Sequence, residues 1–279
     1  METIPPVAAQ CANCGAALQG GYCSRCGQKH WGDHGWSLGH FIHELFHEFT
    51  HVDSSILGTF RALLKPGELT AQYLSGHRAA FVNPIRLYLL TMAVFFFFGA
   101  STDFSLEGMA QIGVASGLLR GIQQKAHAEG VPYHIAVEHY DTVFHQSFSL
   151  LIALGIVSSS LTLWLLMRKR DPWLAKHVVF AVHCYTFFFL VRLVVSGLMH
   201  LGQKARWLAG RQALDYATWV MVVAILTYLL LGMRRVYQEP WNKLIGKWLV
   251  LALVIFCGYA VALAGGTLIV VWTILKVPL

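Results

Sequence analysis

Five long apolar segments constrain this chain more than any other feature of its sequence. They cover residues 85–101, 148–167, 178–200, 216–233 and 248–275. A helix needs about 17 to 25 predominantly apolar residues to cross the hydrocarbon core of a bilayer. Only 13% of the 279 residues are charged, which is about half the share in a soluble domain. We therefore expect an all-α membrane protein with five transmembrane helices, and we exclude a soluble enzyme, a disordered chain and a secreted disulfide scaffold.

Basic residues are distributed unevenly among the loops between these segments. Of the 21 Lys and Arg residues, 14 lie in the N-terminal region and in the loops after the second and fourth segments, whereas six lie in the alternate loops. Loops rich in Lys and Arg stay on the cytosolic side of a membrane. The pattern predicts a cytosolic N-terminus, an external C-terminus and an external segment over 102–147. No apolar span precedes residue 85, so we expect no signal peptide.

Two Cys-x2-Cys motifs stand near the N-terminus, and a glycine follows each of them. Their cysteines are Cys11, Cys14, Cys23 and Cys26. This spacing lets four thiolates reach one tetrahedral ion at about 2.3 Å. Disulfide bonds are not expected on the reducing cytosolic side. We predict a small zinc ribbon over residues 1–30 with one structural zinc ion, and iron remains an alternative for a four-cysteine site.

Two short amphipathic helices are expected between residues 53 and 83. Pro66-Gly67 would end the first helix, and Gly76 would end the second. Their apolar residues are Ile56, Leu57, Phe60, Leu63 and Leu64, followed by Leu69, Tyr73 and Leu74. Basic residues nearby favour an interfacial position on the anionic inner leaflet. We expect residues 31–83 to form a cytosolic or interfacial region between the ribbon and a membrane domain over 84–279.

A stripe of histidines precedes these helices. At 100° per residue, its members fall within one helical arc of about 80°. They are His40, His43, His47 and His51, and an apolar face lies opposite. We predict an amphipathic helix over 36–53. Its histidines could bind a second metal ion, or they could simply form a polar helix face.

The same stripe contains the motif of zinc hydrolases, His-Glu-x-x-His. Residues 43–47 fit it around Glu44, and residues 47–51 repeat it around Glu48. In such enzymes the two histidines bind zinc and the glutamate activates water. Here the histidines oppose the apolar face, and no third ligand follows at the usual spacing. A membrane-tethered zinc metallohydrolase is therefore an alternative hypothesis, with Glu44 or Glu48 as its catalytic residue.

Polar residues within and beside the spans suggest a further alternative, a metal permease. His183 and Arg192 lie inside the third span, and ionisable residues at that depth are functional candidates. The external segment adds four histidines, which are His127, His134, His139 and His145. The spans contain few acidic residues, which disfavours cation transport. Solvated loop residues remain the simpler interpretation of the external histidines.

The order of motifs over roughly the first hundred residues resembles a family of uncharacterised bacterial membrane proteins. The shared features are the two Cys-x2-Cys-Gly motifs, a Gln after the second, an amphipathic helix, Pro66-Gly67, Tyr73-Leu74-x-Gly76-x-Arg78, Phe81, Pro84 and Tyr88. Members of that family combine an N-terminal zinc ribbon with several membrane spans. The family has no activity that could be assigned to this chain. The resemblance implies the same architecture here and a place in the bacterial inner membrane.

These observations favour a binding protein over an enzyme. The leading hypothesis is an integral inner-membrane protein whose cytosolic ribbon and histidine helix form a docking or accessory module. Its partners would be the lipid bilayer and either another protein or a second copy of the chain. Nucleic acid is not expected, because residues 10–30 contain only Arg25 and Lys29, and a phosphate-binding surface needs several cations.

Overall fold

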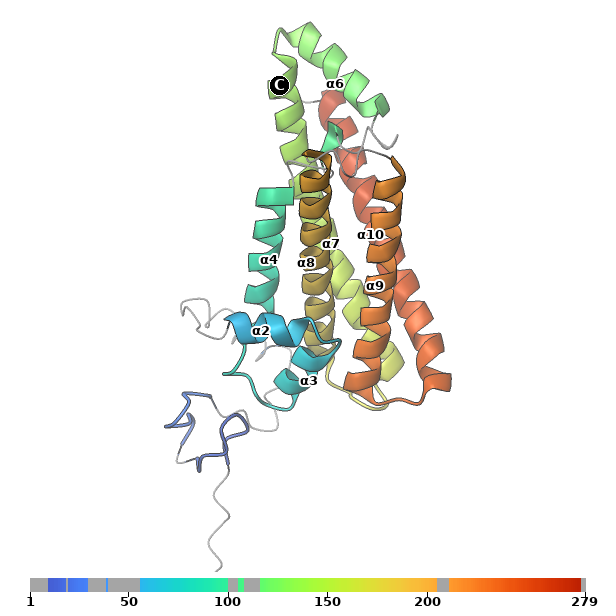
Figure 1. Ribbon diagram of the computed structural model, residues 1–279. Helices are drawn as coiled ribbons and strands as arrows, with labels where there is room; N and C mark the ends of the chain where they lie inside the picture. Colours follow the sequence, from blue (N-terminus) through green and yellow to red (C-terminus); the bar gives the residue numbers. More distant parts are fainter. Residues whose placement is uncertain are drawn as a thin grey trace, which may run out of the picture. The chain divides into compact units, whose positions relative to one another are not determined.

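The computed structural model describes residues 10–18, 20–29, 39, 56–99, 105–107, 116–204 and 211–276 (Figure 1). Among these residues the structure is helical apart from turns and two isolated β-bridges in the cysteine region. The predicted helix over 36–53 lies outside the described residues except for Gly39. The histidine stripe, Glu44 and Glu48 therefore stay predictions.

Eight helices are described. They are α2 (Ile56–Leu63), α3 (Glu68–Leu74), α4 (Pro84–Gly99), α6 (Ser116–Glu129), α7 (Tyr133–Met167), α8 (Leu174–Lys204), α9 (Arg211–Tyr237) and α10 (Trp241–Lys276). The four helices α7 to α10 are long and apolar enough to cross a membrane. The remaining expected span, the first in the chain (85–101), corresponds to the shorter helix α4. Its 16 residues measure about 24 Å, against a hydrocarbon core of about 30 Å.

The segment 102–147, which was predicted to be external, contains much helix. Helix α6 occupies 116–129, and α7 begins at Tyr133 rather than near residue 148. The reason is a buried stripe that continues along α7 at every fourth residue, from Ala136 through Tyr140 and Phe144 to Phe148. Hydropathy alone did not reveal this extension, because polar residues separate the members of the stripe.

The chain folds into two compact units. The first consists of Met1–Leu89, Leu163–Phe187 and Thr227–Trp248, and the second of Leu90–Thr162, Phe188–Leu226 and Leu249–Leu279. In the second unit, glycines let α10 approach α7 closely. A Cβ on Gly265 would lie 2.8 Å from a methyl carbon of Leu151, and one on Gly266 would lie 3.0 Å from the Phe144 ring. Small residues allow such close packing between membrane helices.

In the first unit, α2 and α3 form a short helical hairpin that lies at one end of α8 and α9 (Figure 1). The turn falls at Pro66-Gly67 as expected, and Gly67 adopts the left-handed backbone conformation with φ of 70°. The residues on and just after α2 differ in their exposure. Thr59, Ala62 and Leu63 are buried, whereas Leu57 and Leu64 stay exposed.

Candidate metal centre

The cysteine region consists of two turns of the same shape, one for each Cys-x2-Cys motif. In the first turn, the Cys11 N–H donates to the Ala16 carbonyl and the Gly15 N–H donates to the Cys11 carbonyl, both at 2.8 Å. The second turn repeats these bonds at 2.8 and 2.9 Å. Gly15 and Gly27 both have φ of 72°, a conformation in which glycine is favoured because it lacks a Cβ.

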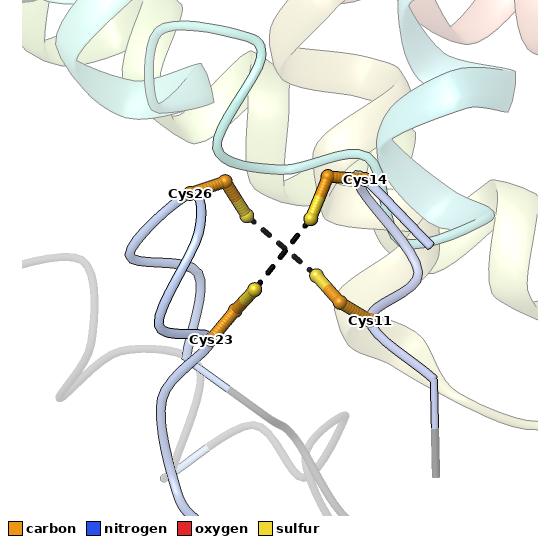
Figure 2. A group of neighbouring side chains, drawn as sticks. All are labelled: Cys11, Cys14, Cys23 and Cys26. Carbon is orange, nitrogen blue, oxygen red and sulfur yellow. Dashed lines mark hydrogen bonds between the residues drawn. The ribbon is translucent and has the colours of Figure 1, made fainter. Parts of the chain in front are cut away.

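The two turns bring all four cysteine sulfurs together (Figure 2). Every pair of sulfur atoms lies within 4.8 Å. The Sγ atoms of Cys11 and Cys26 are 3.6 Å apart, and those of Cys14 and Cys23 are 3.5 Å apart. A tetrahedral ion bound at about 2.3 Å requires sulfurs about 3.8 Å from one another. The four free thiols therefore fit a single metal ion, and each short contact joins one turn to the other.

Backbone N–H groups around the sulfurs favour thiolates on the second turn. Hydrogen bonds from the backbone of Cys26 and of Arg25 lower the pKa of Cys23. A bond from the backbone of Gln28 lowers the pKa of Cys26 to about 6. The bond from Ala16 acts in the same direction on Cys14, but burial and the neighbouring thiols raise its pKa to about 11. A metal ion at the centre would favour the thiolate form of all four.

The cysteine region buries almost nothing else. Of the residues described between 10 and 29, only Cys11 and Cys23 are buried, at 4% and 2% exposure. A segment without an apolar core is stabilised by its metal, so the free energy of metal binding becomes the free energy of folding. The arrangement can thus hold an ion and order the ribbon.

The other candidate ligands that lie among the described residues are not brought together. Among the residues that the structure describes, the four cysteines are the only group of three or more His, Cys, Asp or Glu that could hold a metal ion. The four histidines on α6 and α7, His127, His134, His139 and His145, form no such group. Cys184 and Cys257 are free thiols elsewhere in the chain.

His183, predicted as an intramembrane polar residue, attaches α3 to α8. It is 1% exposed, and its Nδ1 lies 2.9 Å from the Thr70 hydroxyl in a buried hydrogen bond. The ring of Tyr73 meets it edge-on, with centroids 6.2 Å apart. Arg192 lies further along α8, half-buried, in the second unit. Sequence reasoning identified His183 but not its partner, which lies 113 residues away.

Helix α9 contacts the turn of the hairpin through its side chains and a close backbone approach. The Tyr228 hydroxyl donates to the Leu63 carbonyl at 2.8 Å. Arg235 donates to the Pro66 carbonyl at 3.0 Å and forms an ion pair with Glu68 at 2.9 Å. The Tyr228 bond satisfies a carbonyl at the end of α2 that the helix itself leaves free, and the first Arg235 bond satisfies a carbonyl of the turn. Nothing in the local sequence signalled them.

Gln28 connects the cysteine region to the turn after α3. Its Nε2 donates to the Gly76 carbonyl at 2.7 Å. Its Oε1 accepts from the backbone N–H groups of Arg78 and Ala79 at 3.1 and 3.0 Å. The Gln of the second cysteine motif was visible in the sequence, but its spacing gave no sign of a partner near residue 78.

One family model matches a short part of the chain. Residues 53–96 match the model of a family described as a protein of unknown function (DUF3667). The match covers α2, α3 and most of α4, and it supports the expected resemblance to an uncharacterised family. No curated protein and no solved structure matches the chain. The comparisons therefore indicate no activity for this chain.

Proposed function

We propose that this chain is an integral protein of the bacterial inner membrane whose N-terminal zinc ribbon docks a protein partner on the cytosolic side. The four-cysteine cluster carries the proposal, since it shares a compact unit with parts of all four helices long enough to span a membrane, α7 to α10. The function would be binding rather than catalysis.

Zinc is the metal that suits this site best. Four thiolates at tetrahedral spacing select zinc or iron, and two short Cys-x2-Cys turns are typical of zinc ribbons. Four protein ligands complete the coordination sphere, which leaves no open position for water or substrate. A closed site of this kind supports structure, so the ion would order the ribbon as a surface for another molecule.

The proposed topology has five spans, with α4 as the first. Helix α4 is short, but membranes adapt to short helices by local thinning. Basic residues then cluster in the N-terminal region and at the α7–α8 and α9–α10 connections, which supports a cytosolic position for those parts. The C-terminus would lie outside the cytosol.

The ribbon offers an exposed aromatic residue for docking. Tyr22 is 64% exposed on the second cysteine turn. Tyrosine is enriched among the residues that dominate protein interfaces, because its ring buries a large apolar area while its hydroxyl stays hydrogen-bonded. We propose Tyr22 as the centre of the docking surface.

Site-specific photo-crosslinking in living cells tests this proposal. A photoreactive residue at position 22 should give a protein adduct that disappears when Cys11 and Cys14 are replaced by Ser. The same residue at Phe256, which is exposed on α10, serves as the control and should give no ribbon-dependent adduct. An adduct at twice the mass of the chain identifies a second copy as the partner. Absence of an adduct at position 22, or its persistence without the cysteines, contradicts the docking function.

A further inference from the structure

We infer that the metal ion fastens the ribbon to the α3–α4 turn, so that metal loading of the four cysteines controls the conformation of residues 76–79. We call this contact the clasp, and it consists of Ala12, Gln28 and the turn 76–79. The inference rests on the proposed zinc ribbon and extends it: the ribbon would report its metal state to the membrane-embedded part of the first unit.

Both cysteine turns contribute to the clasp. Gln28 of the second turn makes three hydrogen bonds, to Gly76, Arg78 and Ala79. Ala12 of the first turn lies so close to Gly76 that a Cβ there would be 2.6 Å from the Ala12 Cβ. Gly76 also has φ of 104°, a conformation that residues with a side chain rarely adopt. The clasp therefore needs the two cysteine turns at a defined distance from one another.

The metal ion is what sets that distance. The short sulfur contacts each join a cysteine of one turn to a cysteine of the other. Only Cys11 and Cys23 are buried among the ribbon residues described. The Asn13 side chain of the first turn also bonds to a cysteine, Cys26 of the second turn. Gln28 itself belongs to the metal-binding turn, since its carbonyl accepts the Cys23 N–H at 2.8 Å. Loss of the ion would separate Ala12 from Gln28 and release the turn.

The turn leads directly into the buried part of the first unit. It follows α3, where Thr70 is bonded to His183 and Tyr73 packs against Ala175 and Val179 of α8. The clasp thus holds the end of a helix whose other residues pack on a membrane-spanning helix. Loss of the metal ion from the ribbon would therefore change the conformation at the C-terminal end of α3.

Coupling of this kind is reciprocal. If zinc binding raises the equilibrium constant for forming the clasp by a given factor, formation of the clasp must raise the affinity for zinc by the same factor. We expect Gln28→Ala to weaken zinc binding about tenfold, which is equivalent to about 1.4 kcal/mol and lies within the usual range for coupled sites. Gln28 is thus a positioning residue, and its loss should leave all four cysteines able to bind the ion.

Hydrogen exchange on the full-length protein in detergent measures the clasp directly. The Ala79 N–H is the reporter, because it donates to Gln28 at 3.0 Å, whereas the Arg78 N–H also bonds to the Gly76 carbonyl. The Val82 N–H is the internal reference, because it donates to the Thr59 hydroxyl of α2 at 3.0 Å. Removal of zinc by a chelator should accelerate exchange at Ala79 about tenfold or more, while Val82 keeps its rate.

Two variants separate the clasp from general loosening. Gln28→Ala should accelerate exchange of the Ala79 N–H even in zinc-loaded protein. Thr59→Val should accelerate exchange of the Val82 N–H but not of the Ala79 N–H. If the chain loses its zinc and the exchange rate at Ala79 does not change, the clasp is contradicted, whereas the proposed zinc ribbon is not. A purified chain that binds no zinc overturns the proposed ribbon and the clasp together. Equal acceleration at Ala79 and Val82 also overturns the clasp, because it indicates general unfolding of the hairpin.

Discussion

The cysteine ribbon and the α2–α3 hairpin belong to the same unit, yet different forces hold them. The ribbon buries two side chains among its described residues, and both are cysteines. The hairpin buries apolar and polar side chains on both of its helices, and α8 and α9 bond to it. The ribbon should therefore depend on a metal ion, and the hairpin on packing. Changes to one should leave the other folded.

The largest expected effect on the hairpin comes from Gly67→Ala. A Cβ at this position would lie 2.8 Å from the Gly232 Cα, and φ of 70° disfavours any side chain. Left-handed strain costs about 1 to 2 kcal/mol and overpacking about 1 to 3 kcal/mol, so the unit should lose about 2 to 5 kcal/mol of stability. Thermal unfolding in detergent measures the loss.

The matched control for this substitution is Gly58→Ala. Gly58 lies on α2 with no atom near its missing Cβ, so alanine there should be neutral or stabilising. Zinc content should be normal in both variants. Zinc loss from Gly67→Ala would show that the ribbon needs the hairpin in order to fold, which contradicts the separation of the two regions.

A smaller effect is expected from Thr70→Val. This substitution removes the partner of the buried His183 ring and should cost about 1 to 3 kcal/mol. Thr70→Ser keeps the hydroxyl and should retain most of the stability. In a double-mutant cycle with His183→Leu, the combined loss should be smaller than the sum of the two single losses. Strict additivity would mean that the hydrogen bond does not attach α3 to α8.

The smallest effect is expected from Glu68→Gln. The ion pair with Arg235 is partly exposed, with 28% and 44% of the two side chains accessible, so water and salt screen it. The loss should stay below about 1 kcal/mol and shrink as the salt concentration rises. Unfolding at low and high ionic strength tests this, and a large salt-independent loss would mean that the pair does more than stabilise the hairpin electrostatically.

Local chemistry explains which parts of this protein were predictable. Lipid requires continuous apolar helices, so α7 to α10 were visible in the sequence. Pro66-Gly67 and Gly76 marked the ends of α2 and α3, because a turn depends on its own residues. The cysteine cluster was predictable for the same reason, since all four ligands lie within 16 residues.

Long-range contacts explain what the sequence did not reveal. The partners of His183, Gln28 and Leu63 lie between 48 and 165 residues away, and no local pattern points to them. The early start of α7 was missed because polar residues hide its buried stripe from a hydropathy window. Leu57 and Leu64 are exposed, and the sequence could not tell them from the buried Leu63, because the hydropathy of a side chain does not show what covers it.

Metal analysis of the purified full-length chain tests the central claim most directly. We predict one zinc ion per chain in the wild type and less than about a tenth of that in Cys11→Ser/Cys14→Ser. The matched control, Cys184→Ser/Cys257→Ser, should keep the full zinc content because neither cysteine joins the cluster. In the first variant the ribbon should become protease-sensitive while helices α2, α3 and α4 stay resistant. Zinc retained without Cys11 and Cys14, or absent from the wild type, would contradict the account.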